Sequence, residues 1–160
     1  MENTNQKTMT LWQLALMDAV LLTAACLVPA ASHLVQARVY LLNPMMALLL
    51  AGMLLGRDQR NALLLALLMP VASCMLVGMP VAAKAMCMAA QFATVVAMFG
   101  WLQRRWAVLP AVLVAIVAGT VVYYVLKLML TCVLFSPDSA FMAACSLFWG
   151  LAFALLWKRK

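Results

Sequence analysis

"PVAAKAMCMAAQFATVVAMFGWL", residues 80–102, is an apolar stretch whose one charged side chain is Lys84. A helix needs about 20 predominantly apolar residues to cross the hydrocarbon core of a bilayer, so we expect this stretch to be a transmembrane helix. The whole chain is similar: 69% of its 160 residues are hydrophobic and only 9% are charged, and the mean hydropathy is +1.07. A soluble domain carries about 25% charged residues. Residues 1–160 are therefore expected to form a single domain within the membrane.

The apolar runs predict an all-α integral membrane protein, a compact bundle of six transmembrane helices. The expected spans are residues 11–32, 39–56, 61–78, 80–102, 106–135 and 140–157. Polar or turn-forming segments separate them, among them GRDQRN at 56–61 and SPDS at 136–139. The second and third runs are short, so we expect these helices to tilt, to be partly re-entrant or to lie buried in protein.

The charges of the loops predict the orientation of the bundle. Cytoplasmic loops of membrane proteins are rich in Lys and Arg. With the N-terminus inside, the inner segments hold Lys7, Arg57, Arg60, Arg104, Arg105, Lys158, Arg159 and Lys160, and the outer segments hold only Arg38. Both termini are therefore expected in the cytoplasm, and the protein is expected to be a multi-pass protein of the bacterial inner (cytoplasmic) membrane. Trp12, Trp101, Trp106 and Trp157 then form a belt at the inner interface.

The first ten residues are polar and the run after them is long enough to span, so no cleavable signal is expected. The net charge of +7 is explained by the loops, and no nucleic-acid partner is expected.

Three charged residues remain within the spans: Lys84, Lys127 and Asp18. Charged side chains at the bilayer centre cost about 2.5–3.5 kcal/mol on insertion scales, and they are usually functional. Lys84 lies about one turn, and Lys127 about two turns, below the outer surface, on the side that also carries Arg38. Either lysine alone is explained by a long side chain that reaches the headgroups. Together the cations favour a pocket that opens outward and binds an anion.

Aromatic and amide side chains lie near these lysines. Tyr123 and Tyr124 precede Lys127 by one helical turn, Gln91 lies two turns below Lys84, and Trp149 lies in the middle of the last span. Rings combined with a cation and an amide suit a flat organic acid. Ordinary helix packing is the alternative explanation for each of these residues.

Several classes of chemistry have no support in the sequence. The chain has no GxxxxGK[ST] loop, no HExxH motif, no nucleophile elbow and no paired intramembrane carboxylates. The five cysteines form no CxxC pair and are expected to be small core residues. We therefore expect no enzyme, no metal site and no cofactor in this chain.

Local motifs resemble the S component, the substrate-binding membrane subunit, of energy-coupling factor (ECF) vitamin transporters. YLLNPMMALLLAGMLLG at 40–56 is similar to the family's second and third segments, with an Asn-Pro start at Asn43 before a small-residue helix. GMPVAAKAMCMAAQF at 78–92 is similar to the stretch that opens the fourth helix, which helps to line the ligand site. Ala15 and Ala19 match the family's AxxxA motif on helix one, and Asp18 within it departs from the pattern.

The resemblance implies a function. A small anionic, vitamin-like solute is captured from outside by helices four to six and the first outer loop, and ATP-driven uptake is carried out with a T component and two ATPase subunits. Position 2 is Glu2, where cobalt and nickel relatives carry a histidine, so a vitamin-type solute is expected rather than a metal. Lys84 is expected to hold the carboxylate or phosphate of the solute, with Lys127 or Arg38 as second contact. Ala15 and Ala19 are expected to dock on the T component.

Two other functions remain open at this point. One is a cell-envelope morphogenesis scaffold resembling rod-shape factor D, which predicts no small-molecule pocket. The other is a small homodimeric exporter, which predicts an essential membrane acid, for which Asp18 is the candidate.

Overall fold

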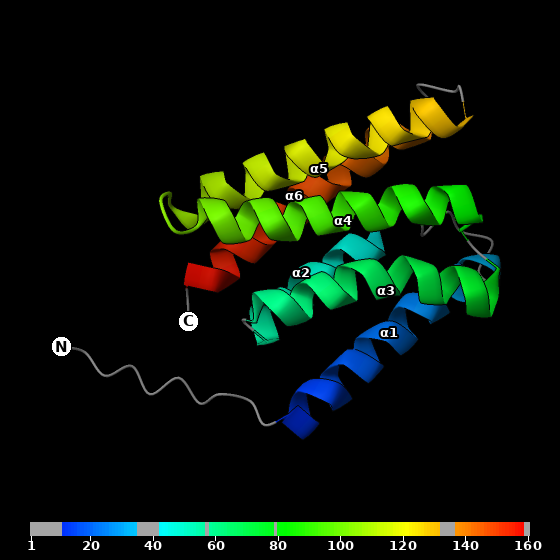
Figure 1. Cartoon of the computed structure of the whole chain (residues 1–160), viewed down its shortest axis with the longest axis horizontal. Helices are drawn as coiled ribbons and strands as arrows, with labels where there is room; N and C mark the ends of the chain where they lie inside the picture. The colour runs from blue at the N-terminus through cyan, green and yellow to red at the C-terminus, as the bar shows by residue number, and fades with distance from the viewer. Residues whose placement is uncertain (1–10, 35–41, 57, 79, 132–136, 159–160) are drawn as a thin grey trace.

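The computed structural model describes residues 11–34, 42–56, 58–78, 80–131 and 137–158 (Figure 1). Within these ranges the regular structure is entirely helical. The helices are α1 (Leu11–Leu34), α2 (Pro44–Gly56), α3 (Gln59–Val77), α4 (Ala82–Leu102), α5 (Val108–Thr131) and α6 (Pro137–Lys158). All but α2 are long and apolar enough to cross a membrane. The predicted all-helical membrane architecture is confirmed at this level.

The ends of the helices follow from local sequence. Asp58 precedes α3, and its carboxylate accepts a hydrogen bond of 3.0 Å from the backbone N–H of Arg60, so it satisfies a backbone donor that the first helical turn leaves unpaired. At the other end of α3, Gly78 adopts a φ of 73°, a conformation that glycine takes without a steric penalty. Pro44 and Pro137 occupy first helical positions, where the missing N–H costs nothing.

Helix α2 is the short member of the bundle. Its 13 residues extend about 20 Å, against about 30 Å for a hydrocarbon core. Most of its core-facing residues are buried, namely Met45, Met46, Leu49, Leu50, Gly52 and Met53. Of the alternatives expected for the second run, the structure supports a helix buried in protein. Residues 39–41 of that expected span lie outside the described residues, so six membrane crossings stay a prediction.

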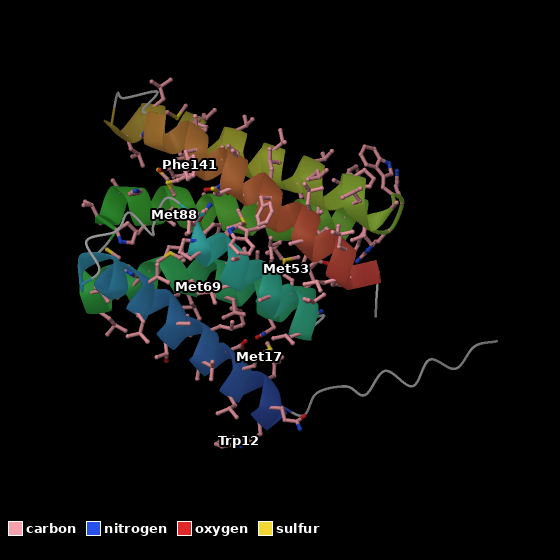
Figure 2. The ribbon with its side chains drawn as sticks, turned by 180° about the vertical axis from the view of Figure 1, so that it is seen from behind. Trp12, Met17, Met53, Met69, Met88 and Phe141 are labelled. Atoms are coloured by element: carbon pink, nitrogen blue, oxygen red, sulfur yellow. The ribbon has the colours of Figure 1, made fainter. Side chains whose placement is uncertain are left out.

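The helices pack in a ring. Helix α4 packs between α3 and α5, α6 packs on α5 and α2, and the contact of α2 with α3 closes the ring, against which α1 packs at α2 and α3. In Figure 1, α4, α5 and α6 lie together on one side, and α1, α2 and α3 on the other. Met53, Met69 and Met88 point into the interior between these helices, whereas Trp12 points away from the bundle (Figure 2).

An aromatic cluster holds the bundle together near one end. The ring of Phe99, which is 2% exposed, makes edge-to-face contacts with Phe153 and Trp157 at centroid distances of 5.4 and 5.7 Å. This geometry is the favoured one for aromatic pairs. The same end carries Arg104 and Arg105, the latter lying 5.6 Å from the ring centroid of Trp101.

Helices α4 and α5 approach each other closely at Gly119. A Cβ atom placed there would lie 2.6 Å from Cγ2 of Val95 and 2.8 Å from the backbone oxygen of Gln91. The backbone oxygen cannot move aside as a flexible side chain can, so only glycine permits this contact. This contact borders the pocket described in the next subsection, because Gln91 also lines that pocket.

Candidate functional site

A small pocket lies between α4, α5, α6 and the residue that precedes α2. Its volume is about 20 Å³, and it is lined by Asn43, Met88, Gln91, Thr120, Tyr123, Tyr124, Met142, Ala143 and Ser146. A space of this size holds about one water molecule or one small polar group. We call these nine residues the outer pocket, after the expected orientation.

Asn43 is the most unusual residue of the outer pocket. It is 4% exposed and has a φ of 48°, a left-handed conformation that asparagine tolerates better than most residues. Asn43 precedes α2, and its backbone oxygen accepts bonds of 3.1 and 3.4 Å from Met46 and Ala47. An asparagine at this position usually turns its side chain back to the helix backbone. Here the side chain reaches α6 instead.

The contact with α6 fixes which way the Asn43 amide points. Ser146 donates its only hydroxyl hydrogen to the backbone oxygen of Met142, at 2.8 Å. Its oxygen therefore accepts from the Asn43 NH₂ group, at 2.7 Å. The side-chain oxygen of Asn43, Oδ1, must then point away from Ser146. It is buried, and no group of the described residues donates a hydrogen bond to it.

Trp149 anchors the chain just before Asn43. Its indole Nε1 donates a hydrogen bond of 2.8 Å to the backbone oxygen of Leu42. Trp149 does not line the outer pocket. It lies one turn along α6 from Ser146, so α6 holds both Leu42 and Asn43 in place. Trp149 was expected to contact the solute, and the structure places it where it holds Leu42 and so positions Asn43 at the pocket.

The two tyrosines form one wall. Their rings meet edge to face at a centroid distance of 5.6 Å, and Tyr123 also packs against the hydrophobic core. Gln91 is 7% exposed and faces them from α4. The structure therefore brings together four of the residues expected from the sequence, Asn43, Gln91, Tyr123 and Tyr124.

The two lysines do not line the outer pocket, and both lie directly beyond it. Lys84 is exposed on α4, one turn from Met88 and two turns from Gln91. Lys127 is half-buried on α5, one turn beyond Tyr123 and Tyr124. The lysines thus flank the same end of the pocket. Arg38 lies outside the described residues.

The expected docking residues lie on α1, away from the pocket. Ala15 and Ala19 are exposed, as are Leu16 and Val20 beside them. Asp18 is half-buried and accepts a hydrogen bond of 2.9 Å from the side-chain amide of Asn61 on α3. The partner that the structure gives Asp18 is thus a neutral amide on a neighbouring helix. The carboxylate therefore turns toward α3, and the small-residue face stays free of its charge.

Sequence reasoning missed five residues of the outer pocket: Met88, Thr120, Met142, Ala143 and Ser146. Ser146 is the important omission, because it orients Asn43. A weak signal was present, since Ser146 is a polar residue one turn from Trp149 within an apolar helix. Among the described residues, no group of three His, Cys, Asp or Glu side chains could hold a metal ion.

Comparison with protein-family models, curated proteins and solved structures finds no match to this chain.

Proposed function

We propose that this chain is the substrate-binding subunit of an ECF-type importer and captures a small anionic, vitamin-like solute. The observation that carries the proposal is the outer pocket, where a buried, oriented amide and neighbouring polar groups lie between α4, α5 and α6 of a largely apolar bundle. Buried polar groups in a membrane protein are costly and usually mark a substrate pathway or site. A purely structural bundle has no need of them there.

The proposed orientation places the pocket on the outer side of the bacterial inner membrane, with six crossings and both termini in the cytoplasm. The described cations at the opposite end, Arg60, Arg104 and Arg105, fit that orientation. Solute then enters from outside, at the end that carries Lys84 and Lys127.

The proposed solute is an anion because of these lysines. Two ammonium groups flanking one end of a low-dielectric pocket raise the local concentration of anions and stabilise a bound carboxylate or phosphate. The pocket of about 20 Å³ is far smaller than the 300–1,000 Å³ typical of sites for drug-sized ligands. A vitamin-sized solute therefore requires α4, α5 and α6 to separate at their outer ends.

The energy for uptake comes from other subunits in this proposal. A T component docks on α1, where Ala15 and Ala19 expose a small-residue face that permits close approach of another helix. Two ATPase subunits hydrolyse ATP, and this chain needs no cofactor of its own.

The test has two parts. Native mass spectrometry of the purified chain is expected to find a retained small anion, and affinity purification from the native membrane is expected to recover a T component and ATPases. Recovery of morphogenesis proteins without a bound solute contradicts the proposal and favours a scaffold. Recovery of the chain alone, as a homodimer, contradicts it in favour of an exporter.

A further inference from the structure

The hydrogen bonds around the outer pocket decide which polar atom of Asn43 remains available as an acceptor. The Asn43 NH₂ group is engaged with Ser146, whose own hydrogen is engaged with Met142. The atom of the Asn43 side chain that no described group donates to is its oxygen, which has lone pairs and no hydrogen. A buried acceptor without a donor is rare in native proteins.

Thr120, on the α5 side of the pocket, is likewise available only as an acceptor. Its hydroxyl donates to the backbone oxygen of Ile116 at 2.8 Å. Any polar contact that the Thr120 oxygen makes with a solute is therefore as an acceptor. A carboxylate placed between Asn43 and Thr120 would face lone pairs from both side chains, and the side-chain donors that line the pocket belong to Gln91, Tyr123 and Tyr124.

We infer that the side-chain oxygen of Asn43 selects the solute: the outer pocket takes an end that carries an N–H or O–H donor, and the anionic end stays toward Lys84 and Lys127. The inference rests on the proposed function and narrows its substrate class to small acids with a donor group opposite the acid. The size of the pocket agrees, because about 20 Å³ accommodates one hydroxyl or amino group rather than a ring.

The experiment compares two acids of nearly equal shape. 4-Hydroxybenzoate has a donor opposite its carboxylate, and 4-fluorobenzoate has a fluorine there that cannot donate. Binding of each to the full-length chain in detergent is measured by calorimetry at neutral pH. We expect the hydroxy acid to bind at least about tenfold more tightly, as a hydrogen bond to a buried acceptor provides.

Variants test whether Asn43 causes the difference in affinity between the two acids. Asn43→Gly removes the amide and keeps the left-handed backbone unstrained, so the affinity ratio is expected to fall to near one. Ser146→Ala removes the group that orients the amide, so the amide is free to turn and the ratio is expected to fall in part. Ser73→Ala, a buried serine on α3 that does not line the pocket, is the matched control and keeps the ratio. If Asn43→Gly fails to insert, the partial fall of the affinity ratio in Ser146→Ala tests the role of the Asn43 amide.

The possible results distinguish failure of the Asn43 inference from failure of the proposed function. Equal binding of the two acids to the wild type overturns the inference, since the acceptor is then satisfied by water, while the anion site stands. A tenfold ratio that persists in Asn43→Gly overturns the assignment to Asn43. If neither acid binds at millimolar concentration, the inference is overturned as well. The proposed function then depends on the separate recovery of the T component and ATPases.

Discussion

Trp149 and Leu42 are joined by a hydrogen bond of 2.8 Å between the indole N–H and a backbone oxygen, across 107 residues of sequence. This bond ties α6 to the chain that leads into α2. Because Asn43 is the next residue, the bond also sets where the Asn43 amide lies relative to α6.

Trp149→Phe should weaken solute binding without unfolding the bundle. Phenylalanine fills most of the same space but has no N–H, so Leu42 loses its tether and Asn43 loses part of its positioning. A loss of about tenfold in affinity is expected, measured by calorimetry with 4-hydroxybenzoate. Leu155→Ala, at an exposed position of the same helix, is the control and should leave affinity unchanged. Equal affinity in wild type and Trp149→Phe would show that the tether has no part in binding.

Lys84→Met should abolish uptake while the protein is still made and inserted. The substitution removes an ammonium group one turn from Met88 and keeps a flexible side chain of similar length, so packing is preserved while the attraction for an anion is lost. Arg104→Met, at the opposite end of α4, is the matched control for removal of a cation. Solute affinity of the purified variant decides the matter: an affinity equal to that of the wild type contradicts the role of Lys84.

Asp18→Asn should preserve uptake. The asparagine oxygen can still accept the hydrogen bond from Asn61, so the tie between α1 and α3 remains. An exporter driven by protonation of a membrane acid predicts the opposite result. Transport assays in cells, with expression checked by immunoblotting, separate the two. Asn61→Ala, which removes the donor, is expected to destabilise the bundle by about 0.6 kcal/mol, the average for such bonds in membranes.

Gly119→Ala should lower the melting temperature of the purified protein. The added methyl group meets the backbone oxygen of Gln91, and the helices must separate to accept it, at a cost of about 1–3 kcal/mol. Gly52→Ala is the matched control, because its Cβ would lie 3.1 Å from the flexible ends of Leu21 and Leu65. A Gly119→Ala protein that melts at or above the temperature of Gly52→Ala contradicts the close contact of α4 and α5.

Reporter fusions test the orientation. A fluorescent protein attached after Lys160 should fluoresce, and alkaline phosphatase at the same position should be inactive, because the C-terminus is expected in the cytoplasm. Phosphatase inserted between residues 78 and 80 should be active. The reverse pattern would place the outer pocket on the cytoplasmic side and remove the basis for capture from outside.

The sequence predicted the helices well because hydrophobic run length and turn residues are local signals. Residues 80–102 were expected as a span and α4 occupies Ala82–Leu102; the expected 106–135 contains Val108–Thr131. The length of α2 was harder to foresee, because Leu42 is as apolar as the helix that follows it. What stops the helix at Pro44 is the left-handed turn at Asn43 together with its hydrogen bond to a residue of α6.

The site was predictable only in part. Helical spacing placed Gln91 near Lys84, and Tyr123 and Tyr124 near Lys127, and Asn43 came from the family resemblance. Ser146 gave only a weak local signal, because its role depends on a contact across 103 residues. Asn61 likewise acts through a long-range contact, its bond to Asp18 across 43 residues. The lysines were expected inside the pocket, and the structure places them one turn beyond it.

The contact at Gly119 also bears on how the proposed solute would enter. Because α4 and α5 approach backbone to backbone there, separating the helices at that level gives up close packing. In the proposed importer we therefore expect the ends near Lys84 and Lys127 to move apart further than the level of Gly119. Entry of a solute would then be a wedge-shaped opening, in which the mouth of the site changes more than its deepest part.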